Sequence, residues 1–168
     1  MKALRLILVV FGLGLICAPA LAEGLNAPQG RAALTVSGKI ANTNGRNVAK
    51  FDLAMLDQLP QHSIKTSTPW FDAPKTFSGP LARDLMKLVG AQGGKVKAIA
   101  LNDYATNIPI QDFQTYDVVL ATRIDGETLN IREKGPVFVI YPFDLVPETK
   151  NEIFFQRCIW QLVQIKVE

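Results

Sequence analysis

TFSGPLARDLMKLVG, residues 76–90, carries the clearest helix signal in the chain, and β-type sequence lies on both sides of it. Ser78 or Gly79 suits the cap of this helix, Pro80 its first turn and Gly90 its end. Its apolar side chains recur at helical spacing and share one face: Leu81, Leu85, Leu88 and Val89. We therefore expect a helix that packs this face against a core.

Outside this helix, short runs of apolar and alternating residues predict strands. We expect them over residues 33–40, 63–66, 96–101, 104–110, 116–124, 136–141 and 159–167. Pro109 marks its strand as an edge strand, because proline cannot donate a hydrogen bond to a neighbour. Many strands with few helices between them predict an α+β fold.

Two turns and a second helix complete the expected framework. The Asn-Gly pair within residues 42–45 and the pair Asp125-Gly126 are typical of tight turns with left-handed residues. Residues 51–59 predict a short helix capped by Asp52.

The first 22 residues have the organisation of a secretory signal peptide. Lys2 and Arg5 give a positive start, an apolar run follows, and small residues precede the expected cleavage point after Ala22. We expect export to the periplasm, a linker over residues 23–30 and one domain over residues 31–168. An uncleaved anchor is the alternative.

Removal of the signal peptide leaves an almost neutral domain. The signal holds two of the 18 basic residues and none of the 15 acidic ones, so the remainder carries a net charge of +1. Because no basic run or stripe remains, we expect no nucleic-acid partner. We expect membrane contact only through the signal peptide.

The chain lacks the side chains of several common catalytic centres. It has one histidine, His62, and only Cys158 remains after cleavage, so we expect no zinc or haem held by side chains. The glycines of residues 90–94 follow a helix instead of preceding one, so no nucleotide is expected. For Cys158 we expect a buried, inert thiol, and the alternative is a reactive thiol beside Arg157.

Polar and aromatic residues gather at the expected strand ends, where loops on a β-scaffold often carry function. They are Trp70, Asn102, Asp103, Tyr104, Arg123, Lys134 and Tyr141. Trp70 belongs to KTSTPWFDAPKTF, residues 65–77, whose prolines predict a stiff segment and whose aromatic pair predicts the rim of a site. The simpler alternatives are a hairpin turn at Asn102-Asp103 and a solvated side chain at Arg123.

An ordered series of motifs runs through the chain from about Ala33 onward. It consists of LTVSGKI (34–40), TFSGPLARDL (76–85), NDYATNIP (102–109), LATRIDGETL (120–129), KGPVFVIYP (134–142) and a closing strand with Trp160. This series resembles the molybdopterin-binding domain of the sulfite oxidase family, in a short exported form. The resemblance implies a mixed α+β fold of several small sheets. It also implies a molybdenum ion held by a pterin dithiolene and by one protein cysteine thiolate.

Two positions depart from this family. The segment expected to hold the cysteine ligand, residues 64–70, contains hydroxyl residues and no cysteine. Phe138 stands where the family often has an arginine. Carried onto this chain, the resemblance implies a cofactor pocket walled by Trp70 and Tyr104, with Asn102 beside them. Its candidate anion contacts are Arg123, Lys134 and Arg157.

Two functions follow from these features. The first is an exported oxidoreductase of the molybdopterin-binding type with altered metal ligation, working alone or with a redox partner. The alternative is a cofactor-free periplasmic module that binds a small or anionic ligand, or acts as a sensor beside an envelope signalling protein. Convergence of residues 66–77, 102–104 and 123 on one basic cavity favours the first. A plug of Trp70, Phe71 and Phe138 favours the second.

Overall fold

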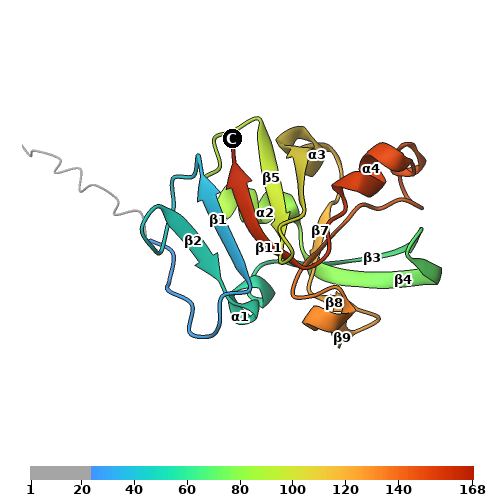
Figure 1. Cartoon of the computed structure of the whole chain (residues 1–168), viewed down its shortest axis with the longest axis horizontal. Helices are drawn as coiled ribbons and strands as arrows, with labels where there is room; N and C mark the ends of the chain where they lie inside the picture. The colour runs from blue at the N-terminus through green and yellow to red at the C-terminus, as the bar shows by residue number, and fades with distance from the viewer. Residues whose placement is uncertain (1–23) are drawn as a thin grey trace, which may run out of the picture.

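Three small β-sheets and a few short helices make up residues 24–168, the part of the chain that the computed structural model describes (Figure 1). This confirms the expected α+β class with several small sheets. The predicted signal peptide and its cleavage point lie outside the described residues. Within residues 24–168, no helix is long and apolar enough to cross a membrane.

The largest sheet has five strands in the order β2-β1-β11-β5-β6. Its strands are β1 (Leu34–Gly38), β2 (Val48–Phe51), β5 (Lys95–Ala100), β6 (Ala105–Pro109) and β11 (Leu162–Val167). Only β1 and β11 of this sheet pair in parallel, and β11 is its central strand, between β1 and β5. β6, which ends in Pro109, lies at the edge as the sequence predicts.

The other two sheets are smaller. One has the order β3-β4-β8-β9, and the other pairs β10 with β7. Their strands are β3 (Gln61–Thr68), β4 (Phe71–Pro80), β7 (Val119–Ala121), β8 (Arg123–Ile124), β9 (Glu127–Thr128) and β10 (Phe138–Ile140). Residues 65–77 therefore form a β-hairpin that turns at Pro69 and Trp70, where the sequence predicts a stiff connecting segment.

The helices are short and fill the spaces between the sheets. They are α1 (Leu53–Asp57), α2 (Ala82–Leu88), α3 (Ile110–Thr115) and α4 (Glu152–Arg157), with the 3₁₀ helices η1 (Ile131–Glu133) and η2 (Pro147–Thr149). Asp52 caps α1 as predicted, because its side chain accepts a hydrogen bond from the Met55 amide. Neither α3 nor α4 is predicted from the sequence, since six residues are too few to show a helical period.

The start of α2 differs from its prediction. Ser78, Gly79 and Pro80 belong to β4, and Leu81 takes the N-cap position without a side-chain hydrogen bond. Gly79 is required by close packing, because a Cβ there would overlap the carbonyl oxygen of Leu120. The end is as predicted: Gly90 has φ +60°, the left-handed geometry that favours glycine after a helix.

Three other local predictions need correction. The left-handed residue of the first turn is Asn47, with φ 58°, and not the predicted Asn-Gly pair. Residues 116–124 form β7 and β8 in two different sheets, because the chain changes sheet at Thr122. The last strand begins at Leu162 with an irregular register, which leaves Ile159 outside it. The turn at Asp125-Gly126 is confirmed, with φ 50° and 88°.

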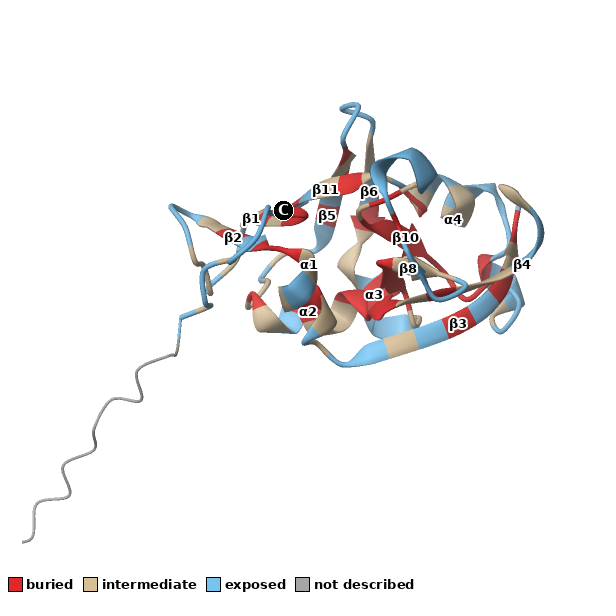
Figure 2. Cartoon of the chain, turned by 90° about the horizontal axis from the view of Figure 1, so that it is seen from below, coloured by how far each residue is buried: buried red, intermediate tan, exposed pale blue. Residues whose placement is uncertain are grey.

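Buried aliphatic and aromatic side chains form one core between the sheets and helices (Figure 2). The predicted linker is attached to it at one end: the amides of Gln29 and Gly30 donate to the carboxylate of Asp52. These backbone hydrogen bonds, the one from Gly30 foremost, lower the pKa of Asp52. One side chain thus caps α1 and fixes the entry of the chain into β1.

Candidate ligand-binding site

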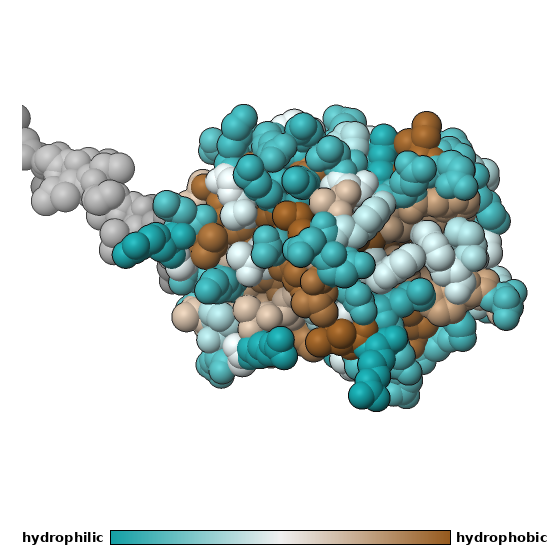
Figure 3. Space-filling model, viewed as in Figure 1, coloured by the Kyte–Doolittle hydropathy of each residue, from teal (hydrophilic) through white to brown (hydrophobic). Residues whose placement is uncertain are grey.

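A cavity of about 550 Å³ lies where the β3–β4 turn, the β5–β6 turn and α4 meet. Pro69 and Trp70 come from the first turn, and Asn102 and Tyr104 come from the second. The remaining wall is made by α4 and by Cys158, Ile159 and Trp160, which lie between α4 and β11. In Figure 3, apolar side chains reach the surface in gaps between polar ones, so the exterior is not uniformly hydrophilic.

Aromatic rings set at different angles form the inner wall of this cavity. Trp70 is almost perpendicular to Phe155, at 78° and 6.1 Å between ring centres, and to Trp160, at 77° and 5.9 Å. Phe138 packs beneath Trp70 at 5.6 Å. Such edge-to-face packing is favourable for aromatic pairs and stabilises the positions of these rings. Phe138 also fills the position at which the family resemblance implies an arginine.

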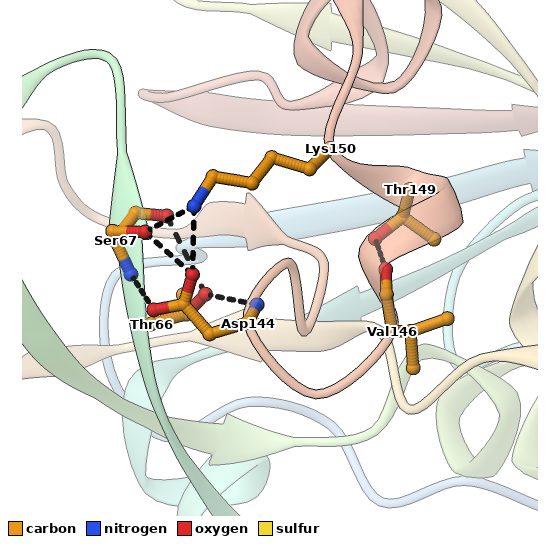
Figure 4. A network of polar contacts seen from close by, with 6 residues as sticks. All are labelled: Thr66, Ser67, Asp144, Val146, Thr149 and Lys150. Atoms are coloured by element: carbon orange, nitrogen blue, oxygen red, sulfur yellow. Dashed lines mark hydrogen bonds and ion pairs between the residues drawn. The ribbon is translucent and has the colours of Figure 1, made fainter.

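The hydroxyl residues of the β3–β4 hairpin form a polar clasp with the loop that follows β10 (Figure 4). The carboxylate of Asp144 accepts hydrogen bonds from the Ser67 amide at 2.6 Å and the Ser67 hydroxyl at 2.5 Å. The Asp144 amide donates to buried Thr66 at 3.0 Å. Lys150 donates to both Ser67 and Asp144. Hydrogen bonds from Ser67, and then from Lys150, lower the pKa of Asp144 to about 2.

This clasp explains what the hydroxyl groups near Trp70 do. Thr66 and Ser67 connect the β3–β4 hairpin to the loop at Asp144, which lies 77 or 78 residues further along the sequence. Ser67 contacts an ammonium group, but the Lys150 side chain is 49% exposed and paired with a carboxylate. A lysine that acts as a general base is usually buried, so the exposed and paired Lys150 favours a structural contact.

The structure brings together Trp70, Asn102 and Tyr104 of the six residues expected at the site. The backbone amide of Tyr104 donates to the Asn102 side chain at 3.2 Å, and Asp103 has φ 64°. The expected hairpin turn at Asn102-Asp103 is therefore present, and the two flanking side chains also line the cavity. A turn at this segment is therefore compatible with a place in the cavity wall.

The three expected anion contacts do not line the cavity, because each has a closer partner. Arg123 donates both terminal nitrogens to Asp57 at 2.8 Å, which lowers the pKa of that carboxyl group. Arg157 donates to Asp112 at 2.7 Å. The ammonium of Lys134 lies 4.3 Å from the ring centre of Trp160. Arg123 is therefore absent from the lining that Trp70, Asn102 and Tyr104 share, and this cavity is not the basic one that would favour the oxidoreductase hypothesis.

The residues present do not fit a molybdenum ion held by a thiolate. Cys158 is 4% exposed at the floor of the cavity, and burial raises the pKa of its thiol, which disfavours the thiolate. Within residues 24–168, no three His, Cys, Asp or Glu side chains are grouped to hold a metal ion. The prediction of a buried Cys158 is confirmed.

The lining residues that the sequence did not predict include Glu152, Phe155, Gln156 and Trp160. The first three lie on α4, for which one local signal exists. Asn151 caps that helix, because its side chain accepts a hydrogen bond from the Ile153 amide at 3.0 Å. An asparagine followed by Glu152 and a run of apolar residues is a local signal for the start of a helix. Trp160 was noted only as part of the closing strand.

No model of a known protein family matches the sequence, and no curated protein matches it. The fold and cavity together define an α+β domain with an aromatic-walled site, and its function has to be argued from that site.

Proposed function

We propose that the protein is a binding module that takes a small molecule into the cavity between Trp70, Tyr104 and Trp160. The observation that carries this proposal is the aromatic wall around a volume of about 550 Å³. Pockets of several hundred Å³ with apolar walls and a few polar groups are typical of small-molecule sites. Here the amides of Asn102 and Gln156 supply polar groups that can orient a ligand.

We further propose that the fold is that of the sulfite oxidase molybdopterin-binding domain, and that the protein is exported to the periplasm. The motif order supports the first proposal, and the signal-like first 22 residues support the second. A planar heterocycle such as a pterin fits the chemistry of the rings without requiring molybdenum. In this location the domain would act as a sensor or partner for an envelope signalling or redox protein.

The oxidoreductase alternative has less support from the site. It needs a metal ligand and cations for the pterin phosphate, whereas Ser67 is committed to Asp144 and Arg123 to Asp57. We therefore favour binding over molybdenum-dependent catalysis. Elemental analysis of protein purified from its native compartment separates the two: one molybdenum per chain would establish the oxidoreductase and overturn the cofactor-free module.

Intrinsic fluorescence is a direct assay, because the two tryptophans of the chain both line the cavity. A metabolite panel is first screened for thermal stabilisation; a ligand at one hundred times its Kd adds about 2.7 kcal/mol. Hits are then titrated by fluorescence. Trp70→Leu is expected to weaken binding about tenfold, because Trp70 is a partly buried aromatic side chain in the cavity wall.

Tyr116→Phe is the matched control, because Tyr116 packs on Phe154 and does not line the cavity. It should leave the affinity unchanged. Hits that bind Trp70→Leu as tightly as the unaltered protein would place the ligand elsewhere and refute the proposed site. A panel without any hit would refute the binding function.

A further inference from the structure

We infer that the ligand of this cavity carries a positive charge, as an amine or quaternary ammonium group held between Glu152 and the aromatic wall. This inference rests on the proposed binding function and specifies its ligand class. It reverses the sign of the ligand charge that the family resemblance implies.

The charges at the cavity favour a cation. Among the described residues that line the cavity, Glu152 is the only one with an acidic or basic side chain of the Asp, Glu, Lys or Arg type. Its side chain makes no ion pair within residues 24–168, although the other end of the same helix pairs Arg157 with Asp112. An anionic ligand would therefore face an unneutralised carboxylate, with the neighbouring guanidinium already engaged.

The aromatic rings supply the second half of such a site. Tryptophan is the best side chain for cation–π contacts, and quaternary ammonium groups are commonly bound by several rings at different angles. Trp70 stands almost perpendicular to both Phe155 and Trp160, which gives the cavity ring surfaces in more than one plane.

One ring of the cavity wall, Trp160, already makes a cation–π contact within the chain, and a ring of α4 outside the lining makes another. Lys134 places its ammonium 4.3 Å from the centre of Trp160, although it lines a different hollow, next to Glu133. A second cation, Arg157, lies 4.9 Å from the centre of Phe154 on α4. Contacts of the same chemistry are thus already made beside the cavity by the chain's own side chains.

Glu152 has one structural role to separate from binding. It lies in the first turn of α4, where a carboxylate is favourable for the helix. The variant Glu152→Gln removes the charge with little change of shape, and Glu148→Gln is the matched control. Glu148 is exposed, near in sequence and outside the cavity lining.

The test uses three probes of one shape: choline, its uncharged carbon isostere dimethylbutanol, and the anion dimethylbutanoate. Each is titrated against the purified protein by quenching of tryptophan fluorescence. Choline is expected to bind about fivefold more tightly than the alcohol, the upper end of the effect of one exposed ion pair. Glu152→Gln should reduce this preference to the part that the aromatic rings supply, Glu148→Gln should keep it in full, and added salt should weaken only choline binding.

The outcomes separate the two proposals. Binding of the alcohol or the anion as tightly as choline would overturn the cationic ligand and leave the binding function standing. If none of the three binds, the hits of the metabolite screen decide. Cationic hits that weaken in Glu152→Gln support the inference, whereas neutral or anionic hits overturn it. A screen with no hits overturns the binding function and this inference with it. Glu152→Gln must remain fully folded at the assay temperature, as thermal unfolding shows, or the loss of binding is structural and the inference fails.

Discussion

Replacement of Asp112 by asparagine is expected to lower the free energy of unfolding by about 2 kcal/mol. Asp112 lies in the first turn of α3 and is 7% exposed. One of its oxygens accepts the hydroxyl of Tyr141 at 2.6 Å and a nitrogen of Arg157 at 2.7 Å. This carboxylate therefore joins α3 to the end of α4, the helix that forms one wall of the cavity.

The magnitude follows from the burial of the pair. Removing one partner of a fully buried ion pair costs about 3–5 kcal/mol. The side chain of Arg157 is 22% exposed and can recover some hydration after the change. The asparagine oxygen also still accepts one hydrogen bond, so we reduce the expected loss to about 2 kcal/mol, or about 4–8 °C in Tm.

Urea unfolding followed by far-ultraviolet circular dichroism measures this loss without relying on the tryptophans. Arg157→Gln and the double variant complete a cycle, in which we expect a coupling energy of about 1 kcal/mol or more. Tyr141→Phe is the control that removes one hydroxyl and should cost about 1 kcal/mol. A loss below about 0.5 kcal/mol for Asp112→Asn, or strict additivity in the cycle, would refute the argument.

Three further changes test other parts of the structure. The pKa of Asp144 is lowered to about 2, so the carboxylate stabilises the fold fully above its ordinary value near 3.8, and this contribution is lost as the pH falls from 3.8 through 2. Asp144→Asn should cost about 1 kcal/mol at pH 7, because the side chain is 36% exposed, and much less at pH 2; an equal cost at both pH values contradicts this. Cys158 should resist alkylation in the folded protein and react after unfolding, as followed by mass spectrometry of its peptide; rapid labelling of the folded protein would show an accessible thiol. Gly79→Ala should cost about 2 kcal/mol or more, since its Cβ meets backbone, whereas Gly94→Ala meets nothing within 4 Å; equal urea midpoints would contradict this packing.

The elements that could be predicted from the sequence are those whose signal is local. The apolar face of α2 and the left-handed Gly90 depend on residues within one or two helical turns. The buried run of β10 and the tight turn at Asp125-Gly126 are likewise encoded within a few positions. The start of α2 could not be predicted from local signals, because Gly79 is required by its close contact with the backbone of β7.

The positions of the charged residues expected at the site depend on partners that are distant in the sequence. Arg123 was expected to meet an anionic ligand, but its partner Asp57 lies 66 residues away in the sequence. Arg157 pairs with a residue 45 positions away. Neither pairing leaves a mark in the sequence near these arginines, because ion pairs form between surfaces that only folding brings together.

The sequence by itself determined the α+β class, a helix that packs one apolar face and ends before Gly90, a buried Cys158 and the absence of a thiol in residues 64–70. The tertiary structure decided the site. It joined the β3–β4 turn, the β5–β6 turn and the residues of α4 around one cavity, and it used Ser67 and Thr66 to clasp a distant loop. The physical reason is that local sequence sets backbone preference and burial pattern, whereas a cavity and its charge arise from side chains whose neighbours are fixed only by packing.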